Sequence, residues 1–306
     1  MRSAGCAKAL PIVCLLWIVL AASACDRSLD SQDTTASERA DPTPMLLIAH
    51  RGASGLAPEH TLASFELAVE IGVDFLEQDL QQTRDGALVV LHDDTLNRTA
   101  RGPEADCSGR VHDKTLAQLE RCDFGAWFRE KHPAVGDRFD GQRILTLDTL
   151  IERFGHSVRY YIETKHPEEA EDLEDSLLST LSEHGLLEAD SASSLVFQSF
   201  SKESLVVLAE KAPRVPRVQL LDRKEVEPPY DVQLSEIAKY ADGIGPNYRD
   251  VDATLVEAAH RHGLKIHVYT VNDPEEMRRL EALDVDGIFS DFPDRYRELN
   301  AEASAP

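Results

Sequence analysis

The 306-residue sequence is short of positive charge. It contains 32 Lys and Arg residues against 55 Asp and Glu residues, which gives a formal net charge of -23 at pH 7. A surface with this charge repels nucleic acid and anionic lipid. The composition therefore disfavours a function that requires binding either one over a broad surface. A negatively charged small substrate would need a local cationic spot or a bound metal ion.

A long hydrophobic run is also missing. Arg2 and Lys8 precede an uncharged stretch, residues 9–24, that is rich in Leu, Ile and Val but too short to span a bilayer comfortably. This pattern predicts a secretory signal peptide over residues 1–24. The stretch ends in Leu20-Ala21-Ala22-Ser23-Ala24-Cys25, which resembles the bacterial lipobox, with Ala22 where that motif usually has Leu.

The lipobox resemblance implies that the signal is cut before Cys25 and that this cysteine receives lipid. We therefore expect an exported bacterial lipoprotein, anchored to a membrane and facing the periplasm. The alternative is ordinary cleavage after Ala22 or Ala24, which would release a soluble exported product. Asp26 would retain such a lipoprotein at the inner membrane in some bacteria, and the choice of membrane stays open.

Cysteine is scarce, and most of it is accounted for by the export signal. Of the five cysteines, Cys6 and Cys14 leave with the signal and Cys25 is assigned to lipid. The remaining pair, Cys107 and Cys122, closes a short loop, which in an oxidising compartment favours a disulfide. Two buried free thiols are the alternative, and a zinc site is disfavoured because the nearby histidine gives no zinc-like spacing.

Residues 26–44 contain almost no large apolar side chain. They are dense in Ser, Asp, Thr, Pro and Ala, a composition that cannot form a core, and so we expect residues 25–44 to be a flexible tether. Folded structure should begin near Met45 and continue to residue 306. About 260 residues suit one large barrel or two small domains.

Beyond the tether, apolar runs alternate with helical patterns. We expect strands at 46–49, 76–80, 88–92, 160–164, 195–200, 218–221, 243–246, 266–270 and 287–289. We expect helices at about 61–71, 167–183, 202–211, 234–240, 253–262 and 274–283. This repetition favours an α/β fold of the TIM-type (β/α)8 barrel. An open, doubly wound sheet is the alternative, although no GxGxxG or P-loop spacing follows any of these strands.

One connection is too short for a crossover helix, which predicts a β-hairpin irregularity early in the barrel. Only seven residues, 81–87, separate the strand at 76–80 from the strand at 88–92. A two-residue turn at Asp85-Gly86 would set Asp79 opposite His92. Glu77, Asp79 and His92 would then all point to the same face.

Acidic and imidazole side chains end several of these strands. Glu77, Asp79 and Glu163 are charges in apolar surroundings, which is costly unless they are paired or bind an ion. Three converging carboxylates suit a hard cation such as calcium or magnesium better than zinc. His50 and His92 end apolar runs beside these acids, an arrangement equipped for proton transfer next to a cation, although a lone strand-end histidine is commonly structural.

The motifs together resemble the glycerophosphodiester phosphodiesterase family, over almost the whole chain from His50 to Pro293. Each motif is weak alone, but their order and spacing resemble those of the family, and the Pro-Glu-His-Thr form resembles its periplasmic branch. They are His50-Arg51-Gly52-Ala53-Ser54, Pro58-Glu59-His60-Thr61, Glu77-x-Asp79, His92-Asp93, Glu163-x-Lys165, Gln198-Ser199-Phe200 and Tyr269-Thr270-Val271-Asn272. Tyr269 stands where Trp is common, and Leu145 where Pro often precedes Thr-Leu.

The resemblance implies a metal-dependent hydrolase that converts glycerophosphodiesters to glycerol 3-phosphate and an alcohol. It implies a divalent cation, Ca²⁺ in preference to Mg²⁺, on Glu77, Asp79 and Glu163, with His50 and His92 as general base and acid. In the implied mechanism the free hydroxyl of the glycerol moiety attacks phosphorus, and water then opens a cyclic phosphate. Four residues become candidate substrate-binding groups: Arg51 and Lys165 for the phosphate, and Phe200 and Tyr269 for the glycerol end. Core packing is the alternative for these two aromatic residues.

The segment at about 95–143 is long and mixed, and we expect it to be an insertion in the barrel. It could form a lid stapled by the cysteine pair, or a small subdomain with only a packing role. Two rival functions are a phospholipase D-like or phosphoinositide-cleaving enzyme on the same barrel and a non-catalytic surface lipoprotein. The acidic composition disfavours the first, and the complete set of motif residues disfavours the second.

Overall fold

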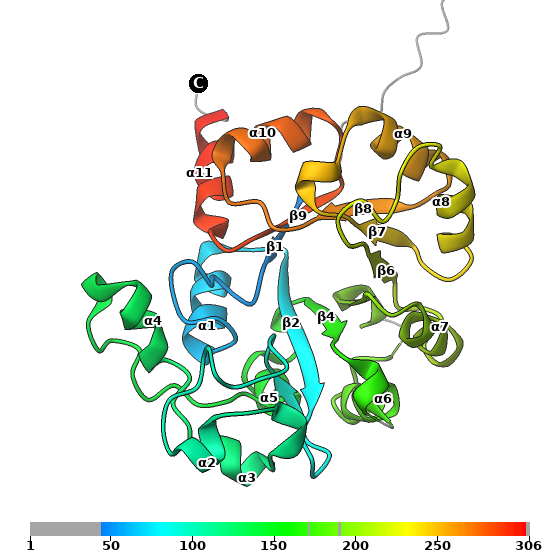
Figure 1. The fold of residues 1–306 in the computed structure, drawn as a ribbon. Helices are drawn as coiled ribbons and strands as arrows, with labels where there is room; N and C mark the ends of the chain where they lie inside the picture. The colour runs from blue at the N-terminus through cyan, green and yellow to red at the C-terminus, as the bar shows by residue number, and fades with distance from the viewer. Residues whose placement is uncertain (1–43, 171, 189–190, 304–306) are drawn as a thin grey trace, which may run out of the picture. The chain divides into compact units, whose positions relative to one another are not determined.

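The computed structural model describes residues 44–170, 172–188 and 191–303, all within one compact unit that spans residues 43–306 (Figure 1). The predicted signal peptide, the lipidated Cys25 and the tether as far as residue 43 lie outside the described residues. No helix in the described part combines the length and the apolar character that crossing a membrane would need.

Eight parallel strands close into a barrel, as the sequence predicts. β1 pairs with both β9 and β2, so the barrel sheet has no free edge, and the open-sheet alternative is wrong. In barrel order the strands are β1 (Leu46–Ala49), β2 (Phe75–Gln82), β4 (Tyr160–Thr164), β5 (Leu195–Ser199), β6 (Arg217–Leu220), β7 (Gly243–Gly245), β8 (Lys265–Val268) and β9 (Gly287–Ser290).

Helices connect the strands, and two apolar clusters join them to the outer face of the barrel. They are α1 (Leu62–Ile71), α5 (Leu147–Phe154), α6 (Leu173–Glu183), α7 (Lys202–Lys211), α8 (Asp231–Ile237), α9 (Ala253–Arg261), α10 (Pro274–Ala282) and α11 (Pro293–Ala303). The helix expected at 167–183 is instead a 3₁₀ turn, Pro167–Glu169, and the separate helix α6, because the chain is extended at Ala170 between them.

The barrel interior changes from apolar to charged along the strands. Side chains alternate between the two faces of a strand, so Phe75 and Tyr161 lie in the apolar interior with Ile48 and Phe289, and the residues two and four positions later face the same way. The sequence thus carries its acids on the inward face of β2 and β4, towards their carboxyl ends. In a barrel of this kind that end carries the active site.

The hairpin exists, but the predicted register is wrong by one residue. β3 (Leu88–Val90) runs antiparallel to the end of β2, with Leu80 opposite Val90 and Gln82 opposite Leu88. The loop contains three residues, not two, because Thr83 N donates to Ala87 O and Gly86 adopts a φ of 85°. The backbone N of Leu91 therefore donates to the backbone O of Asp79, and His92 does not lie opposite Asp79 as predicted.

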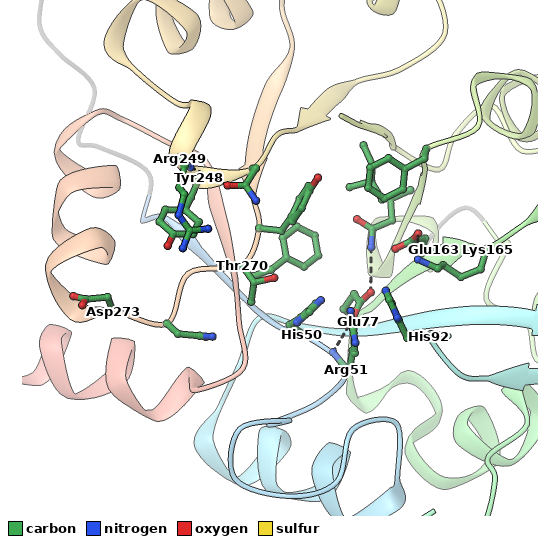
Figure 2. A pocket seen from close by; sticks show the side chains of 17 residues that line it. His50, Arg51, Glu77, His92, Glu163, Lys165, Tyr248, Arg249, Thr270 and Asp273 are labelled. Carbon is green, nitrogen blue, oxygen red and sulfur yellow. Dashed lines mark hydrogen bonds and ion pairs between the residues drawn. The ribbon is translucent and has the colours of Figure 1, made fainter. Parts of the chain in front are cut away.

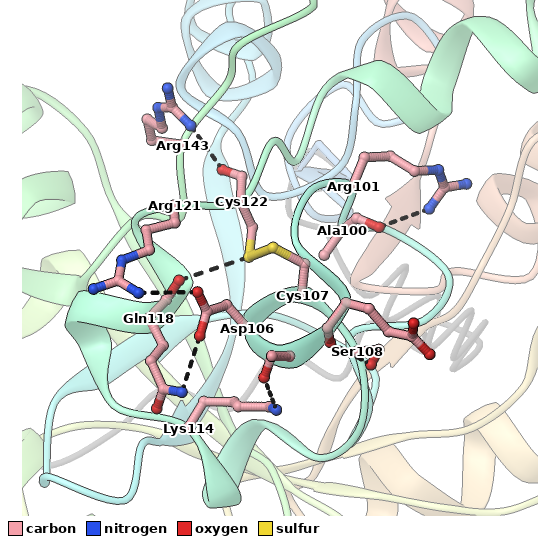
Figure 3. The surroundings of a disulfide bond; sticks show 12 residues. Ala100, Arg101, Asp106, Cys107, Ser108, Lys114, Gln118, Arg121, Cys122 and Arg143 are labelled. Atoms are coloured by element: carbon pink, nitrogen blue, oxygen red, sulfur yellow. Dashed lines mark hydrogen bonds and ion pairs between the residues drawn. A yellow bond between two sulfur atoms is a disulfide. The ribbon is translucent and has the colours of Figure 1, made fainter.

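The insertion has its own short elements and its own core. Its elements are α2 (Glu104–Cys107), a 3₁₀ turn (Val111–Asp113), α3 (Leu116–Leu119), α4 (Ala126–Lys131) and a second 3₁₀ turn (Pro133–Val135). Cys107 and Cys122 form a disulfide within an apolar cluster of this segment (Figure 3). α4 packs through Trp127 and Phe128 against residues of α1 and the loop before it.

Candidate active site

A cavity of about 580 Å³ opens at the carboxyl ends of the barrel strands (Figure 2). Its size is typical of pockets that bind small molecules. It is lined by His50, Arg51, Glu77, His92, Glu163, Lys165, Gln198, Phe200, Leu220, Asn247, Tyr248, Arg249, Tyr269, Thr270, Asn272, Asp273 and Phe289. The structure therefore brings eight predicted site residues to one cavity, with Asp79 directly behind them.

Glu77, Asp79 and Glu163 form a compact buried cluster. One carboxylate oxygen from each lies within 4.8 Å of the others, and all three residues are buried. The parallel register of β2 and β4 sets Asp79 beside Glu163 and continues to Gln198 on β5. The three acids that the sequence predicts as metal ligands are thus assembled by neighbouring strands, without any contribution from the hairpin register.

Asp79 lies among cationic and hydrogen-bonding groups. His60 Nε2 donates to Asp79 Oδ2 at 2.7 Å, Arg51 Nε lies 3.4 Å from the same oxygen, and Lys165 Nζ lies 3.8 Å from Oδ1. Burial alone would raise the pKa of Asp79, but Lys165, the hydrogen bond from His60 and Arg51 together hold it well below its usual range. These neighbours therefore favour the ionised form of Asp79.

Glu77 and Glu163 have the opposite electrostatic character. Burial raises the pKa of Glu77 well above its usual range, and the charges of Asp79 and Glu163 raise it further, although Arg51 N donates to Glu77 at 2.7 Å. Burial and then Asp79 raise the pKa of Glu163 to about 8, against the attraction of Lys165 at 2.9 Å. Three close carboxylates resist full ionisation until a cation or protons compensate them.

The residues present fit a divalent cation. Besides the three acidic residues, Gln198 donates from Nε2 to Glu77 at 3.3 Å, while its Oε1 is buried with no hydrogen-bond partner among the described residues. A buried carbonyl oxygen without a partner is unfavourable unless an ion or an ordered water contacts it. Four oxygen donors of this kind are the ligands that hard cations prefer.

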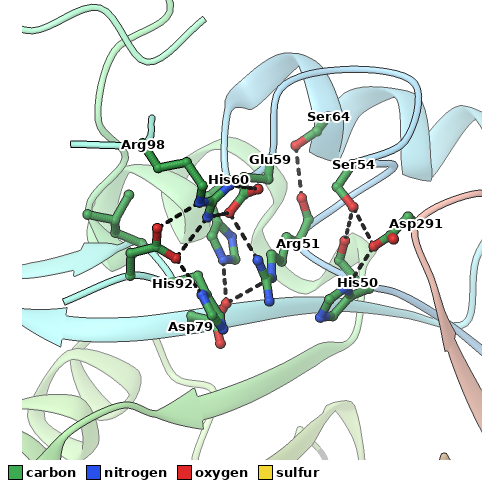
Figure 4. Close-up of polar contacts among 12 residues, drawn as sticks. His50, Arg51, Ser54, Glu59, His60, Ser64, Asp79, His92, Arg98 and Asp291 are labelled. Atoms are coloured by element: carbon green, nitrogen blue, oxygen red, sulfur yellow. Dashed lines mark hydrogen bonds and ion pairs between the residues drawn. The ribbon is translucent and has the colours of Figure 1, made fainter. Parts of the chain in front are cut away.

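His50 is oriented by a carboxylate from the other end of the chain. Its Nδ1 lies 2.6 Å from Asp291 Oδ1, and Asp291 also accepts hydrogen bonds from Ser54 at 2.9 Å and Asn272 at 2.7 Å (Figure 4). The His50 ring packs edge-on against Phe289 at the wall of the cavity. With Nδ1 donating to Asp291, Nε2 is the nitrogen left to exchange a proton.

His92 has a similar arrangement. Its Nδ1 lies 2.8 Å from Asp93 Oδ1, and Arg98 donates to both oxygens of Asp93, at 2.6 and 2.9 Å. Burial lowers the pKa of His92, although the hydrogen bond to Asp93 opposes this effect. β3 ends at Val90, so His92 lies in the loop after the strand. Its side chain lines the cavity from that position.

Two cations and two aromatic rings complete the predicted set. Arg51 and Lys165 line the cavity beside the acids, and the Lys165 ammonium lies 5.9 Å from the centre of the Phe200 ring. Phe200 and Tyr269 meet edge to face, with ring centroids 6.2 Å apart. Phe200 is 41% exposed, which is high for a large apolar side chain and leaves its ring open to the cavity.

Several residues that support the site were not singled out from the sequence. His60 lies inside a quoted motif, but nothing in the motif shows that it contacts Asp79. Glu59 of the same motif could position Arg51 or cap the helix that follows, and the structure shows its contact with Arg51 at 3.1 Å. Asp291 directly follows the apolar strand β9, and a charged residue at the carboxyl end of a barrel strand is itself a usable signal. The partners of Asp93 could be found only from the coordinates.

Comparison with known proteins identifies one family of phosphodiesterases. A family model described as the glycerophosphoryl diester phosphodiesterase family matches residues 50–295. A glycerophosphodiester phosphodiesterase of Bacillus subtilis is 42% identical over 260 residues, which cover 84% of this chain and 87% of the relative. One of Caldanaerobacter subterraneus is 33% identical over 260 residues, 83% of this chain and 97% of the relative.

Solved structures agree with these relatives. A phosphodiesterase of Oleispira antarctica, in complex with the product sn-glycerol-3-phosphate, has a TM-score of 0.72 and 28% identity, covering 86% of this chain and 97% of that chain. A glycerophosphodiester phosphodiesterase of Agrobacterium tumefaciens has a TM-score of 0.68 and 28% identity, covering 83% and 100%.

Proposed function

This chain belongs to the glycerophosphoryl diester phosphodiesterase family and is a glycerophosphodiester phosphodiesterase, and we propose that it works by acid–base catalysis between two histidines beside a divalent cation. Its substrates are then glycerophosphodiesters, and its products glycerol 3-phosphate and an alcohol. The rival prediction that the protein has no catalytic activity is therefore wrong.

One observation carries the proposed mechanism. His50 and His92 line the same cavity as Glu77, and each ring is held at Nδ1 by its own carboxylate (Figures 2 and 4). Both Nε2 atoms are thereby left available to the reacting groups. One imidazole accepts the proton of the attacking hydroxyl and the other protonates the departing alcohol, and their roles reverse when water opens the cyclic phosphate.

Glu77, Asp79 and Glu163 would hold the cation, and Gln198 Oε1 is available beside them. We propose Ca²⁺, with Mg²⁺ as the alternative, because Ca²⁺ accepts a larger and less regular set of oxygen ligands. When bound, the cation supplies Lewis-acid stabilisation for negative charge that develops on the phosphoryl oxygens.

The substrate is oriented by four further side chains. Arg51 and Lys165 bind the phosphate, which gives this acidic protein a local cationic spot for an anionic ligand. Phe200 and Tyr269 form an apolar corner for the carbon skeleton of the glycerol moiety. These assignments are supported by the position of each side chain on the cavity wall.

The deciding experiment is an assay of glycerol phosphate release from glycerophosphocholine, with and without a chelator. Release that EDTA abolishes and Ca²⁺ restores would support the proposal. Release that is unaffected by EDTA would overturn the role of the cation. Cleavage of phospholipid or phosphoinositide vesicles with no release from glycerophosphocholine would favour the lipid-directed alternative instead.

We also propose that the protein is exported and anchored to a membrane, facing the periplasm, through lipid on Cys25. The signal-like residues 1–24 and the lipobox-like sequence before Cys25 support this location. Incorporation of labelled palmitate into the wild-type protein but not into Cys25→Ser would agree with it. Equal labelling of both proteins, or none of either, would contradict lipidation at this residue.

A further inference from the structure

Arg98 links two residues that line the candidate active site, through the carboxylate that each of them contacts. The residue lies in the insertion, and its planar guanidinium makes four hydrogen bonds to two carboxylates (Figure 4). Nε and NH2 donate to Asp93 at 2.6 and 2.9 Å, and NH1 and NH2 donate to Glu59 at 2.7 Å each. Such forked bonds fix direction as well as distance, which a single ammonium cannot do.

Each of the two carboxylates continues to a residue that faces the substrate. Asp93 Oδ1 also contacts His92 Nδ1 at 2.8 Å, and Glu59 Oε1 also accepts from Arg51 NH1 at 3.1 Å. A continuous chain therefore runs from His92 through Asp93, Arg98 and Glu59 to Arg51. Its two ends are a proposed proton-transfer group and a proposed phosphate-binding group.

The Glu59 carboxylate of this chain is held as an anion. The side chain of Glu59 is only 9% exposed, which would raise its pKa, but the hydrogen bonds from Arg98 and the charge of Arg51 lower the pKa to about 2. Glu59 is then shared between two arginines throughout the working pH range. Removing either arginine would leave a buried charge partly uncompensated.

The insertion fixes Arg98 from its other side. The guanidinium carbon lies 5.6 Å from the centre of the Trp127 ring, and Trp127 is itself only 5% exposed and donates from Nε1 to Phe124 O. Arg101 NH1 also donates to the backbone oxygen of Arg98. The position of Arg98 is therefore set by the packing of α4 and not by the barrel alone.

We propose that Arg98 is a positioning residue that holds His92 and Arg51 in a fixed relation to each other across the scissile phosphate. This role rests on the proposed function, because it presupposes the tasks given above to His92 and Arg51. It also assigns the insertion a part in catalysis, through the one guanidinium that it supplies to both carboxylates.

The test compares Arg98→Met, Arg98→Lys and Arg129→Met. Arg129 is a matched control because it lies in the same insertion, forms an ion pair with Asp140 and does not line the cavity. With glycerophosphocholine as substrate, Arg98→Met should lower kcat/KM roughly 10–100-fold, the range typical of residues that orient active-site groups. Both kcat and KM should change, since His92 and Arg51 are both released, and Arg129→Met should keep wild-type values.

Arg98→Lys separates orientation from simple charge balance. A lysine restores one positive charge but cannot make the forked bonds to both acids, so most of the loss in kcat/KM should remain. A lysine variant with full activity would overturn the proposal, because charge alone would then suffice. Full activity of Arg98→Met would overturn it as well.

Two further variants keep the test decisive if Arg98→Met folds poorly. Glu59→Gln combined with Arg98→Met removes the buried charge together with its partner, and it should fold and still show a reduced kcat. In an Asp93→Asn background, Arg98→Met should lower kcat much less than it does alone, because its route to His92 is already broken. Fully additive losses would contradict a role through Asp93.

Parallel assays of His92→Ala distinguish failure of this proposal from failure of the proposed function. Intact turnover in His92→Ala would overturn the proposed two-histidine mechanism, and the role of Arg98 with it. An inactive His92→Ala together with a fully active Arg98→Met would overturn the role of Arg98 alone.

Discussion

At the scale of single residues, the two histidines share one pattern but differ in what balances their carboxylates. Asp291, the partner of His50, accepts its other hydrogen bonds from the neutral groups of Ser54 and Asn272. Asp93, the partner of His92, is instead bound by a guanidinium. The same local geometry thus has two electrostatic settings, which suits a reaction that needs one proton acceptor and one proton donor.

His50→Ala and His92→Ala should each lower kcat by roughly 10²–10⁴-fold, the usual contribution of a general acid or base. The fold should stay near native because both rings border a cavity rather than the core. Glycerol phosphate release and the circular dichroism spectrum are the measurements. His112→Ala, at an exposed position of the insertion, is the control and should be fully active. Turnover that survives the loss of either active-site histidine would remove that residue from the mechanism.

Glu163→Gln should raise the Ca²⁺ concentration needed for half-maximal activity. The change removes one of three clustered carboxyl groups while keeping an oxygen of similar size in place. A titration of activity with Ca²⁺ measures the shift. Glu152→Gln is the control, since this exposed glutamate of α5 lies outside the cavity and outside the acidic cluster. An unchanged Ca²⁺ requirement in Glu163→Gln would mean that Glu163 is not a ligand.

Much of the candidate site could be predicted from the sequence, because strand periodicity and motif spacing act over short distances. Glu77 and Asp79 share a face for this reason, and Glu163 joins them through the parallel pairing of β2 and β4. The partner of His50 could not be predicted in the same way. Asp291 meets His50 across 241 residues, and only the closure of the barrel between β9 and β1 brings them together.

At the scale of elements, the one wrong register shows what local rules miss. Asp85-Gly86 favours a two-residue turn, but only Gly86 takes a positive φ, and Asp85 instead accepts a hydrogen bond from Leu116 N of the insertion. This hydrogen bond between the hairpin and the insertion is found together with the three-residue loop. His92 still reaches the cavity because β3 ends two residues before it.

The disulfide should stabilise the insertion, and with it the position of the segment that carries Arg98. Cys107 and Cys122 are 15 residues apart, and closing a loop of that length contributes about 3 kcal/mol in the chain-entropy model. Cys107→Ser together with Cys122→Ser should therefore lower the melting temperature by about 6–12 °C. Thermal denaturation with and without reductant measures this. Equal melting of both proteins under both conditions would mean that no bridge forms in solution.

At the scale of the whole molecule, stability should depend on pH through the buried acids. The pKa of Glu163 is raised from 4.5 to about 8, first by burial and then by Asp79. A carboxyl whose pKa rises on folding stabilises the folded state fully below its unfolded pKa, and that stability is lost as pH rises through the folded pKa. Asp79, whose pKa is lowered, stays ionised across this window and adds no dependence. The pKa values of His60, His92 and His267 are lowered by burial, and these groups oppose this trend below their ordinary pKa of 6.5. Cation-free protein should thus melt at lower temperature as pH rises from about 6.5 to 8.

A bound cation should offset this loss, because it replaces the protons that the cluster gives up. At 100 times its Kd, one ligand stabilises the folded state by about 2.7 kcal/mol, which corresponds to a rise in melting temperature of roughly 5–10 °C. The measurement is calorimetry in EDTA and in CaCl₂ at several pH values, with Glu163→Gln as the control that lacks the titrating group. The variant should show a flatter pH dependence in EDTA and a smaller rise with Ca²⁺. Equal responses of wild type and variant would show that the cation binds elsewhere.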